Sequence, residues 1–207
     1  MLGSVAASRT AERPRPRTQA ERRAETRAAL LNATIESLIT YGYGGTTTGR
    51  IAELAGVSRG AQTPYFPSRA DLVAAAVQHL ADLRFKAYSE RIAGREITVE
   101  EGLDAIWEEY KGPLFGAVIE LWVAARTDPD LREKLIEIEH NVTAAITEVA
   151  EESLGPIAKR KGFNDDLVFA LATVRGLALL RISNDVSDEA LAARWEQARE
   201  RLVAMFG

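Results

Sequence analysis

The chain has 207 residues, of which 46% are hydrophobic and 27% charged, a composition typical of a globular protein with one or two domains. It contains no cysteine and only two histidines, which excludes disulfides and thiolate nucleophiles, and we predict neither a metal site nor a cofactor. The longest uncharged run, residues 37–49, is shorter than the roughly 20 apolar residues that a membrane helix needs. The first eight residues lack the features of a secretory signal, so we expect a cytoplasmic protein without membrane association.

The net charge of −4 conceals a difference between the two ends of the chain. Residues 1–70 contain ten arginines against five acidic residues, whereas residues 71–207 carry 16 basic against 25 acidic residues. A basic end on an acidic body is typical of a protein that contacts a polyanion with one end only. Residues 1–17, where arginine alternates with proline, are predicted to be a disordered basic tail.

Apolar residues recur at three- and four-residue spacing along nearly the whole chain, which predicts an all-α protein. In the first part, glycines after Tyr41 end the first helix, Gly56 ends the second, Ser58 caps the third, and Ser68 with Asp71 caps the fourth. These signals predict an N-terminal domain over residues 18–70, with helices over residues 18–41, 46–55 and 58–65, and a long connecting helix over residues 69–92.

The remainder of the chain, residues 71–207, is predicted to be a second helical domain. Thr98 with Glu101 forms a capping box, and Asp128 followed by Pro129 is a typical helix start. These signals place helices over residues 99–111, 113–126, 129–154, 165–182 and 188–206.

The helix over residues 165–182 is apolar almost all round, so we expect one side to face the core and the other a second subunit. The last helix carries an apolar stripe that can pack beside it. The predicted dimer interface consists of small residues that allow close approach and larger ones that supply apolar area: Ala172, Gly176, Ala178, Leu191, Trp195 and Leu202.

Residues 46–72 have the parts of a helix-turn-helix. A short helix, a tight turn over residues 55–58 and a second short helix are what this DNA-reading motif requires. The second helix of such a motif enters the major groove with its N-terminal residues foremost, which brings Arg59, Gln62 and Thr63 within reach of base edges.

About 60 residues, roughly residues 20–80, resemble the N-terminal DNA-binding domain of TetR-type transcriptional repressors. The matching residues are Thr46, Thr47, Ile51, Ala52, the run Ala55 to Ser58, Gly60, Phe66, Ser68 and Leu72. The resemblance implies a homodimer that binds double-stranded operator DNA and whose C-terminal helical domain holds a small-molecule pocket. The implied DNA-binding residues are Arg22, Arg23, Thr46, Thr47, Ser58, Arg59, Gln62, Thr63, Tyr65 and Arg69.

Pro64 departs from the family pattern, in which histidine is common at this position. A proline inside a helix removes one hydrogen bond and strikes the carbonyl four residues back, at a cost of about 3 kcal/mol. We therefore expect the second helix of the motif either to end or tighten near Thr63, or to be kinked.

Four aromatic residues on two successive helices, Trp107, Tyr110, Phe115 and Trp122, either line an apolar effector cavity or form plain core. The polar ligand-binding candidates are His79, Glu120 and Arg175. His79 has an alternative role in hydrogen-bonded packing. Arg175 lies in an apolar helix and needs a partner, for which Glu120, a residue of a second subunit and an anionic ligand are candidates.

The predicted function is that of a transcriptional regulator, most simply a repressor that a small, mainly apolar effector releases from a pseudo-palindromic operator, and not that of an enzyme. Two alternatives stay open. Residues 56–60 fit the G-x-S-x-G nucleophile elbow of a serine hydrolase, with Ser58 as nucleophile, but that elbow needs a preceding strand where this sequence predicts a helix. The second alternative is a helical interaction protein that has lost DNA binding through Pro64.

Overall fold

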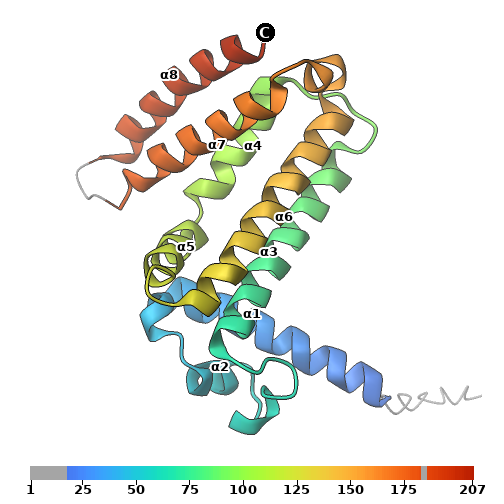
Figure 1. Cartoon of the computed structure of the whole chain (residues 1–207), viewed down its shortest axis with the longest axis vertical. Coiled ribbons are helices and arrows are strands. Elements are labelled where there is room, and N and C mark those ends of the chain that lie inside the picture. Colours follow the sequence, from blue (N-terminus) through green and yellow to red (C-terminus); the bar gives the residue numbers. More distant parts are fainter. Residues whose placement is uncertain (1–17, 183–185) are drawn as a thin grey trace, which may run out of the picture.

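A computed structural model of the chain describes residues 18–182 and 186–207, so the predicted basic tail lies outside the described residues. All regular elements of the described part are helical, which confirms the predicted all-α fold (Figure 1). They are α1 (Gln19–Gly45), α2 (Thr48–Leu54), the 3₁₀ helix η1 (Arg59–Ala61), α3 (Arg69–Ile92), α4 (Val99–Lys111), α5 (Pro113–Ala124), α6 (Pro129–Ser153), the 3₁₀ helix η2 (Gly155–Lys159), α7 (Phe163–Leu179) and α8 (Asp188–Phe206). Within this part, no helix combines the length and hydropathy needed to cross a membrane.

Most helix starts lie where the capping residues predict them. Ser68 with Asp71 and Thr98 with Glu101 form complete capping boxes, and Asp128 accepts a hydrogen bond from Leu131 N at 3.0 Å. Helix α1 departs from the prediction, because it continues through a kink at Gly42 as far as Gly45.

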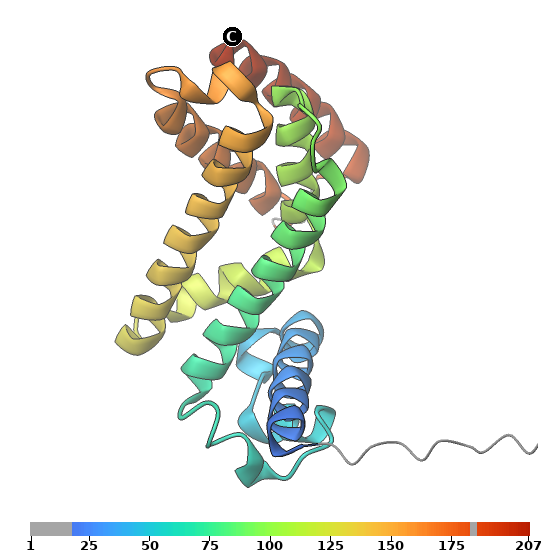
Figure 2. The ribbon, with the colours of Figure 1, turned by 90° about the vertical axis from the view of Figure 1, so that its right-hand side faces the viewer.

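Helices α1 and α2, η1 and the first turns of α3 enclose a small apolar core, and we call this part the head. Its fully buried side chains include Leu30, Leu31, Ile51 and Leu72. Helix α3 then leaves the head and continues beside α6 (Figures 1 and 2). One continuous helix therefore belongs to both parts of the molecule.

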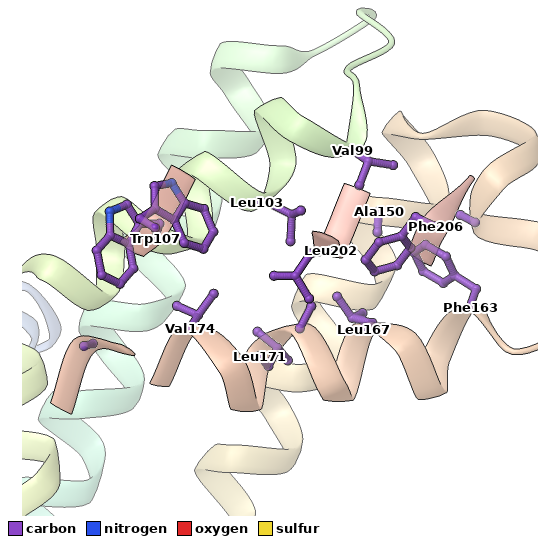
Figure 3. Packing of buried hydrophobic residues seen from close by; sticks show 14 of the residues in the cluster. Val99, Leu103, Trp107, Ala150, Phe163, Leu167, Leu171, Val174, Leu202 and Phe206 are labelled. Carbon is purple, nitrogen blue, oxygen red and sulfur yellow. The ribbon is translucent and has the colours of Figure 1, made fainter. Parts of the chain in front are cut away.

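The rest of the described chain, which we call the body, has two groups of helices. Helices α3 and α6 form one group, and α4, α7 and α8 form the other around a core that contains Leu103, Trp107, Leu171, Val174 and Leu202 (Figure 3). Helix α5 runs crosswise, packs against α3 and α6, and contacts α1 of the head (Figure 2). It is the structural link between the head and both groups of the body.

Asp71 connects the start of α3 to α6. Its carboxylate accepts a hydrogen bond from Lys134 Nζ at 2.6 Å and one from the Ser68 hydroxyl at 2.7 Å. The bond from Lys134, followed by those from Ser68, lowers the pKa of the Asp71 carboxyl below its ordinary value. A carboxyl with a lowered pKa stabilises the fold above its unfolded pKa, and this stabilisation is lost as the pH falls through the folded pKa.

We expect Asp71→Asn to lower the thermal unfolding midpoint at neutral pH and to lower it much less in acid, once the pH has fallen below the lowered pKa of the folded carboxyl and the wild-type group is itself protonated. Thermal unfolding measured at both pH values checks this. Glu137→Gln, an exposed carboxyl on α6, is the control. An equal loss of midpoint at both pH values would show that the ion pair is not the cause.

Candidate functional site

The first helix and the turn of the predicted motif are present in the head. Thr47 caps α2 by accepting a hydrogen bond from Arg50 N at 3.2 Å. After α2, Gly56 adopts a φ of +66°, a left-handed conformation that an L side chain rarely takes. This glycine makes the tight turn that the helix-turn-helix reading requires.

The second helix of the motif is much shorter than predicted. Only the three residues Arg59–Ala61 are helical, as a 3₁₀ turn, and Ser58 precedes them without a side-chain capping bond. Tyr65 N and Phe66 N both donate to Gln62 O at 2.9 Å, in a turn that contains Pro64. Because proline has no N–H to continue a helical ladder, the segment tightens before residue 64, which was one of the two expected outcomes.

The proposed DNA-contacting residues differ in how accessible they are. Arg22, Arg23, Thr47, Ser58, Arg59 and Thr63 are exposed, whereas Gln62, Tyr65 and Arg69 are half-buried. Gln62 Oε1 is buried, and no hydrogen-bond partner for it is found among the described residues. The exposed set lies on α1, before α2 and along the tightened segment after it.

The prediction for Thr46 is wrong. This residue is fully buried, and its hydroxyl donates to Gly42 O at 2.7 Å and accepts from the Ser37 hydroxyl at 3.0 Å. Its hydroxyl therefore fastens the end of α1 and has no access to DNA. No local pattern predicts this contact, because Ser37 is nine positions away and the adjacent threonines are equally good candidates for a helix cap.

Arg69 is also engaged within the protein. Its guanidinium lies 3.8 Å from the centroid of the Tyr43 ring and donates to Tyr43 O. This combination of stacking and hydrogen bonding holds the segment after the α1 kink against the start of α3. The role predicted for Arg69, a free phosphate contact, conflicts with this arrangement.

A joint between head and body lies where α1 kinks. Gly42 has a φ of +65° and a ψ of −178°, and the following Tyr43 N donates to Glu120 Oε2 at 2.6 Å. A Cβ on Gly42 would lie 2.9 Å from Glu120 Cδ and closer still to both carboxylate oxygens. Glu120 was predicted to face a ligand; instead it is exposed on α5, where it holds the α1 backbone.

A cavity of about 630 Å³ lies in the body, between the α3–α6 pair and the second group of helices. Tyr110, Phe115 and Trp122 line it, as the cavity interpretation of these aromatics expects. Trp107 does not: it is buried in the core and stacks on Trp195 with ring centroids 4.9 Å apart. His79, half-buried on α3, does not line the cavity either.

Arg175 has a partner that the sequence did not identify. Its Nη2 lies 2.6 Å from Glu139 Oε2, and its Nε donates to the Tyr110 hydroxyl at 2.9 Å. The guanidinium also lies 5.4 Å from the centroid of the Trp122 ring. Burial raises the pKa of the Tyr110 phenol above its ordinary value, so the phenol keeps its proton at neutral pH. Arg175 is therefore neutralised within the subunit, by Glu139 rather than Glu120.

We expect Arg175→Met to destabilise the fold by about 1–3 kcal/mol, because it leaves the Glu139 carboxylate half-buried beside an apolar cavity without its charged partner. Adding Glu139→Gln to Arg175→Met should recover most of this loss. Urea unfolding of the wild type, both single variants and the pair measures the coupling. A pair no more stable than Arg175→Met alone would contradict the assignment.

The predicted dimer interface divides into two sets. Ala172 and Gly176 are exposed on α7, together with Val168 and Phe169, whose side chains are 57% and 60% exposed, and with Leu179. We call these five residues the α7 face. Ala178, Leu191, Trp195 and Leu202 are buried in the core of their own subunit, so their assignment to the interface is wrong. A helix that is apolar all round does not reveal from sequence which side turns inward.

The hydrolase alternative lacks its scaffold in the described part of the chain. Ser58 lies between α2 and η1, and no strand precedes it or occurs elsewhere in residues 18–182 and 186–207. A nucleophile elbow depends on a strand-to-helix turn.

Comparisons with known proteins agree with this architecture. The family model of bacterial regulatory proteins of the tetR family matches residues 30–76. The HTH-type transcriptional regulator CymR of Pseudomonas putida is 33% identical over 173 residues, which cover 80% of this chain and 84% of that protein.

Solved structures share the fold. A TetR transcription regulator from Haloarcula marismortui aligns with a TM-score of 0.64 at 19% identity, over 88% of this chain and 96% of that one. The regulator FadR from Bacillus subtilis, solved in complex with stearoyl-CoA, aligns with a TM-score of 0.63 at 20% identity, over 86% and 97% of the two chains. The identity with CymR over most of both chains and the match of the family model show that the chain belongs to the tetR family of bacterial regulatory proteins, which are helix-turn-helix regulators of transcription.

Proposed function

We propose that the chain is a homodimeric repressor that binds a pseudo-palindromic operator and leaves it when a small, mainly apolar molecule occupies the body cavity. The observation that carries this proposal is the position of α5. Phe115 and Trp122 of this helix line the cavity, and Glu120 of the same helix holds the α1 backbone of the head. A ligand that binds more tightly to one position of α5 therefore biases the orientation of the head. The size of this bias is set by the difference in the ligand's affinity for the two positions.

In this proposal residues 18–70 bind DNA and residues 71–207 bind the effector and dimerise. Arg59 and Thr63, both exposed on the tightened segment, read base edges in the major groove. Arg22 and Arg23, exposed on α1, contact the phosphate backbone. The remaining candidates of the proposed set are Thr47 and Ser58, which are exposed, and Gln62 and Tyr65, which are half-buried.

The mainly apolar character of the effector follows from the cavity lining, in which aliphatic and aromatic side chains predominate. FadR of Bacillus subtilis, which shares the fold, was solved with stearoyl-CoA bound, a ligand with a long apolar chain. That precedent supports an apolar ligand for this chain without identifying it.

Dimerisation is proposed through the α7 face. Its apolar side chains are exposed in a single subunit, and Gly176 allows two helices to approach closely. A two-fold axis through this face gives the two heads the symmetry of a palindromic operator.

The test is binding of the purified protein to duplexes from the upstream region of its own gene, measured by fluorescence anisotropy at several salt concentrations. We expect the affinity to fall steeply with salt, because phosphate contacts release counterions. Arg59→Ala should reduce the discrimination between the preferred duplex and a scrambled one. Arg201 is an exposed arginine on α8, at the far end of the molecule from the head. Arg201→Ala should therefore change neither the salt dependence of the affinity nor the discrimination between the two duplexes. Absence of binding to every fragment would favour an interaction protein without DNA binding.

A further inference from the structure

The body cavity is long. Its lining residues on α3 run from Val77 to Ile92 and those on α6 from Leu135 to Ser153. At a rise of about 1.5 Å per residue, the α3 stretch alone is about 22 Å long. The inner end lies at Phe115 and Trp122 beside the head, and the outer end lies at Phe206 near the C-terminus.

A cavity of this length, lined mainly by aliphatic and aromatic side chains, suits an extended apolar ligand. A compact ring system would fill only a short part of such a cavity.

The charges along the cavity are already paired within the protein. The lining carboxylates and their basic partners are Glu101 with Arg95, Asp104 with Arg199, Glu108 with Lys111, Glu109 with Arg84, and Glu139 with Arg175. No lining carboxylate therefore awaits a cationic ligand. Arg91, at the outer end, has no carboxylate partner among the described residues but is exposed to water, where a charge attracts an anion only weakly.

One polar group at the inner end has hydrogen-bonding capacity to spare. The Tyr110 hydroxyl accepts a hydrogen bond from Arg175 Nε, and no acceptor for its own proton is found among the described residues. Tyr110 lines the cavity, so this proton can be donated to a ligand oxygen. The adjacent Arg175 and Glu139 side chains neutralise each other, so this place offers no unpaired charge to an anionic or a cationic ligand.

We propose that the effector is an uncharged molecule with a long hydrocarbon chain and an oxygen that accepts a hydrogen bond from the Tyr110 hydroxyl, as in an ester, ketone or alcohol. The oxygen lies at the inner end, and the chain runs outward between α3 and α6. This inference rests on the proposed function, since it names the class of molecule that the same cavity receives.

The first experiment compares three probes that have the same chain and differ in charge: methyl laurate, laurate and laurylamine, each below its micelle concentration. Calorimetry at neutral pH should give the tightest binding for the ester and at least about tenfold weaker binding for the acid and the amine. Tyr110→Phe should weaken binding of the ester by about fivefold, the value of one neutral hydrogen bond. Tightest binding of the acid or the amine, or an unchanged affinity in Tyr110→Phe, would overturn the proposal.

The second experiment tests the direction of the chain. Ile146 lines the middle of the cavity on α6, so Ile146→Trp should obstruct the outer half. We expect this variant to weaken methyl palmitate at least tenfold more than methyl octanoate, whose shorter chain stays in the inner half. Ile136→Trp, on the same helix and outside this cavity, is the control and should affect neither. Equal effects on both esters would overturn the inner position of the oxygen.

The DNA-binding measurement keeps this inference separate from the proposed function. If the protein binds operator duplexes but none of the probes, the proposed ligand class is wrong and the proposed DNA-binding function stands. If methyl laurate binds in the expected way and does not release the operator, the cavity chemistry is right and the repressor mechanism is wrong.

Discussion

Gly42→Ala is expected to destabilise the protein and to weaken operator binding more than any other single change in the joint. The φ of +65° and ψ of −178° at Gly42 belong to a region open almost only to glycine, and forcing alanine into it costs about 1–3 kcal/mol. The new Cβ would also collide with the Glu120 carboxylate and disrupt its hydrogen bond with Tyr43 N. Urea unfolding and operator anisotropy measure the two effects.

Two matched variants separate these causes. Gly44→Ala is the control, since a Cβ there meets nothing within 4 Å and its φ is not positive. Gly42→Ala combined with Glu120→Ala removes the collision and keeps the backbone strain, so it should recover part of the loss. If Gly42→Ala and Gly44→Ala behaved alike, the kink would have no role in stability or in DNA binding.

Phe169→Asp is expected to convert the proposed dimer to monomers and to reduce operator affinity by at least about a hundredfold. Phe169 is 60% exposed in the single subunit, and a carboxylate in its place would be buried without a partner when two α7 faces meet. A monomer engages one half-site only and loses the gain of binding both together. Sedimentation velocity and operator anisotropy at the same protein concentration measure both effects.

Ile136→Asp is the comparison variant, because Ile136 is a similarly exposed apolar residue on α6, outside the α7 face. It should remain a dimer and keep its affinity for the operator. A dimeric Phe169→Asp beside a monomeric Ile136→Asp would move the interface to α6.

The features that the sequence predicts well depend on residues close together in the chain. Capping boxes such as Ser68 with Asp71 act over three residues, and the turn at Gly56 depends on one glycine, so both are visible in the sequence. The shortened segment after Ser58 is a partial success, since Pro64 indicates a disturbance but does not determine its form.

The features that the sequence does not predict depend on contacts between distant residues. Arg175 and Glu139 lie on different helices, and several acidic residues of the chain were equally available as partners. Glu120 meets the α1 backbone 77 positions earlier, a contact that no local pattern encodes. The inward side of α7 depends on how α4 and α8 cover it, which its own apolar residues do not specify.

The placement of the aromatic residues gives the protein an internal optical probe. Of the three tryptophans, Trp107 and Trp195 are stacked in the core, where Trp195 Nε1 donates to Asp104 at 2.8 Å. Trp122 alone lines the cavity. Emission from the stacked pair should stay nearly constant during a titration, so a change in intrinsic fluorescence reports the surroundings of a single indole. The unlabelled wild-type protein can therefore follow cavity occupancy in the presence of operator DNA, with Trp122→Phe as the silent reference.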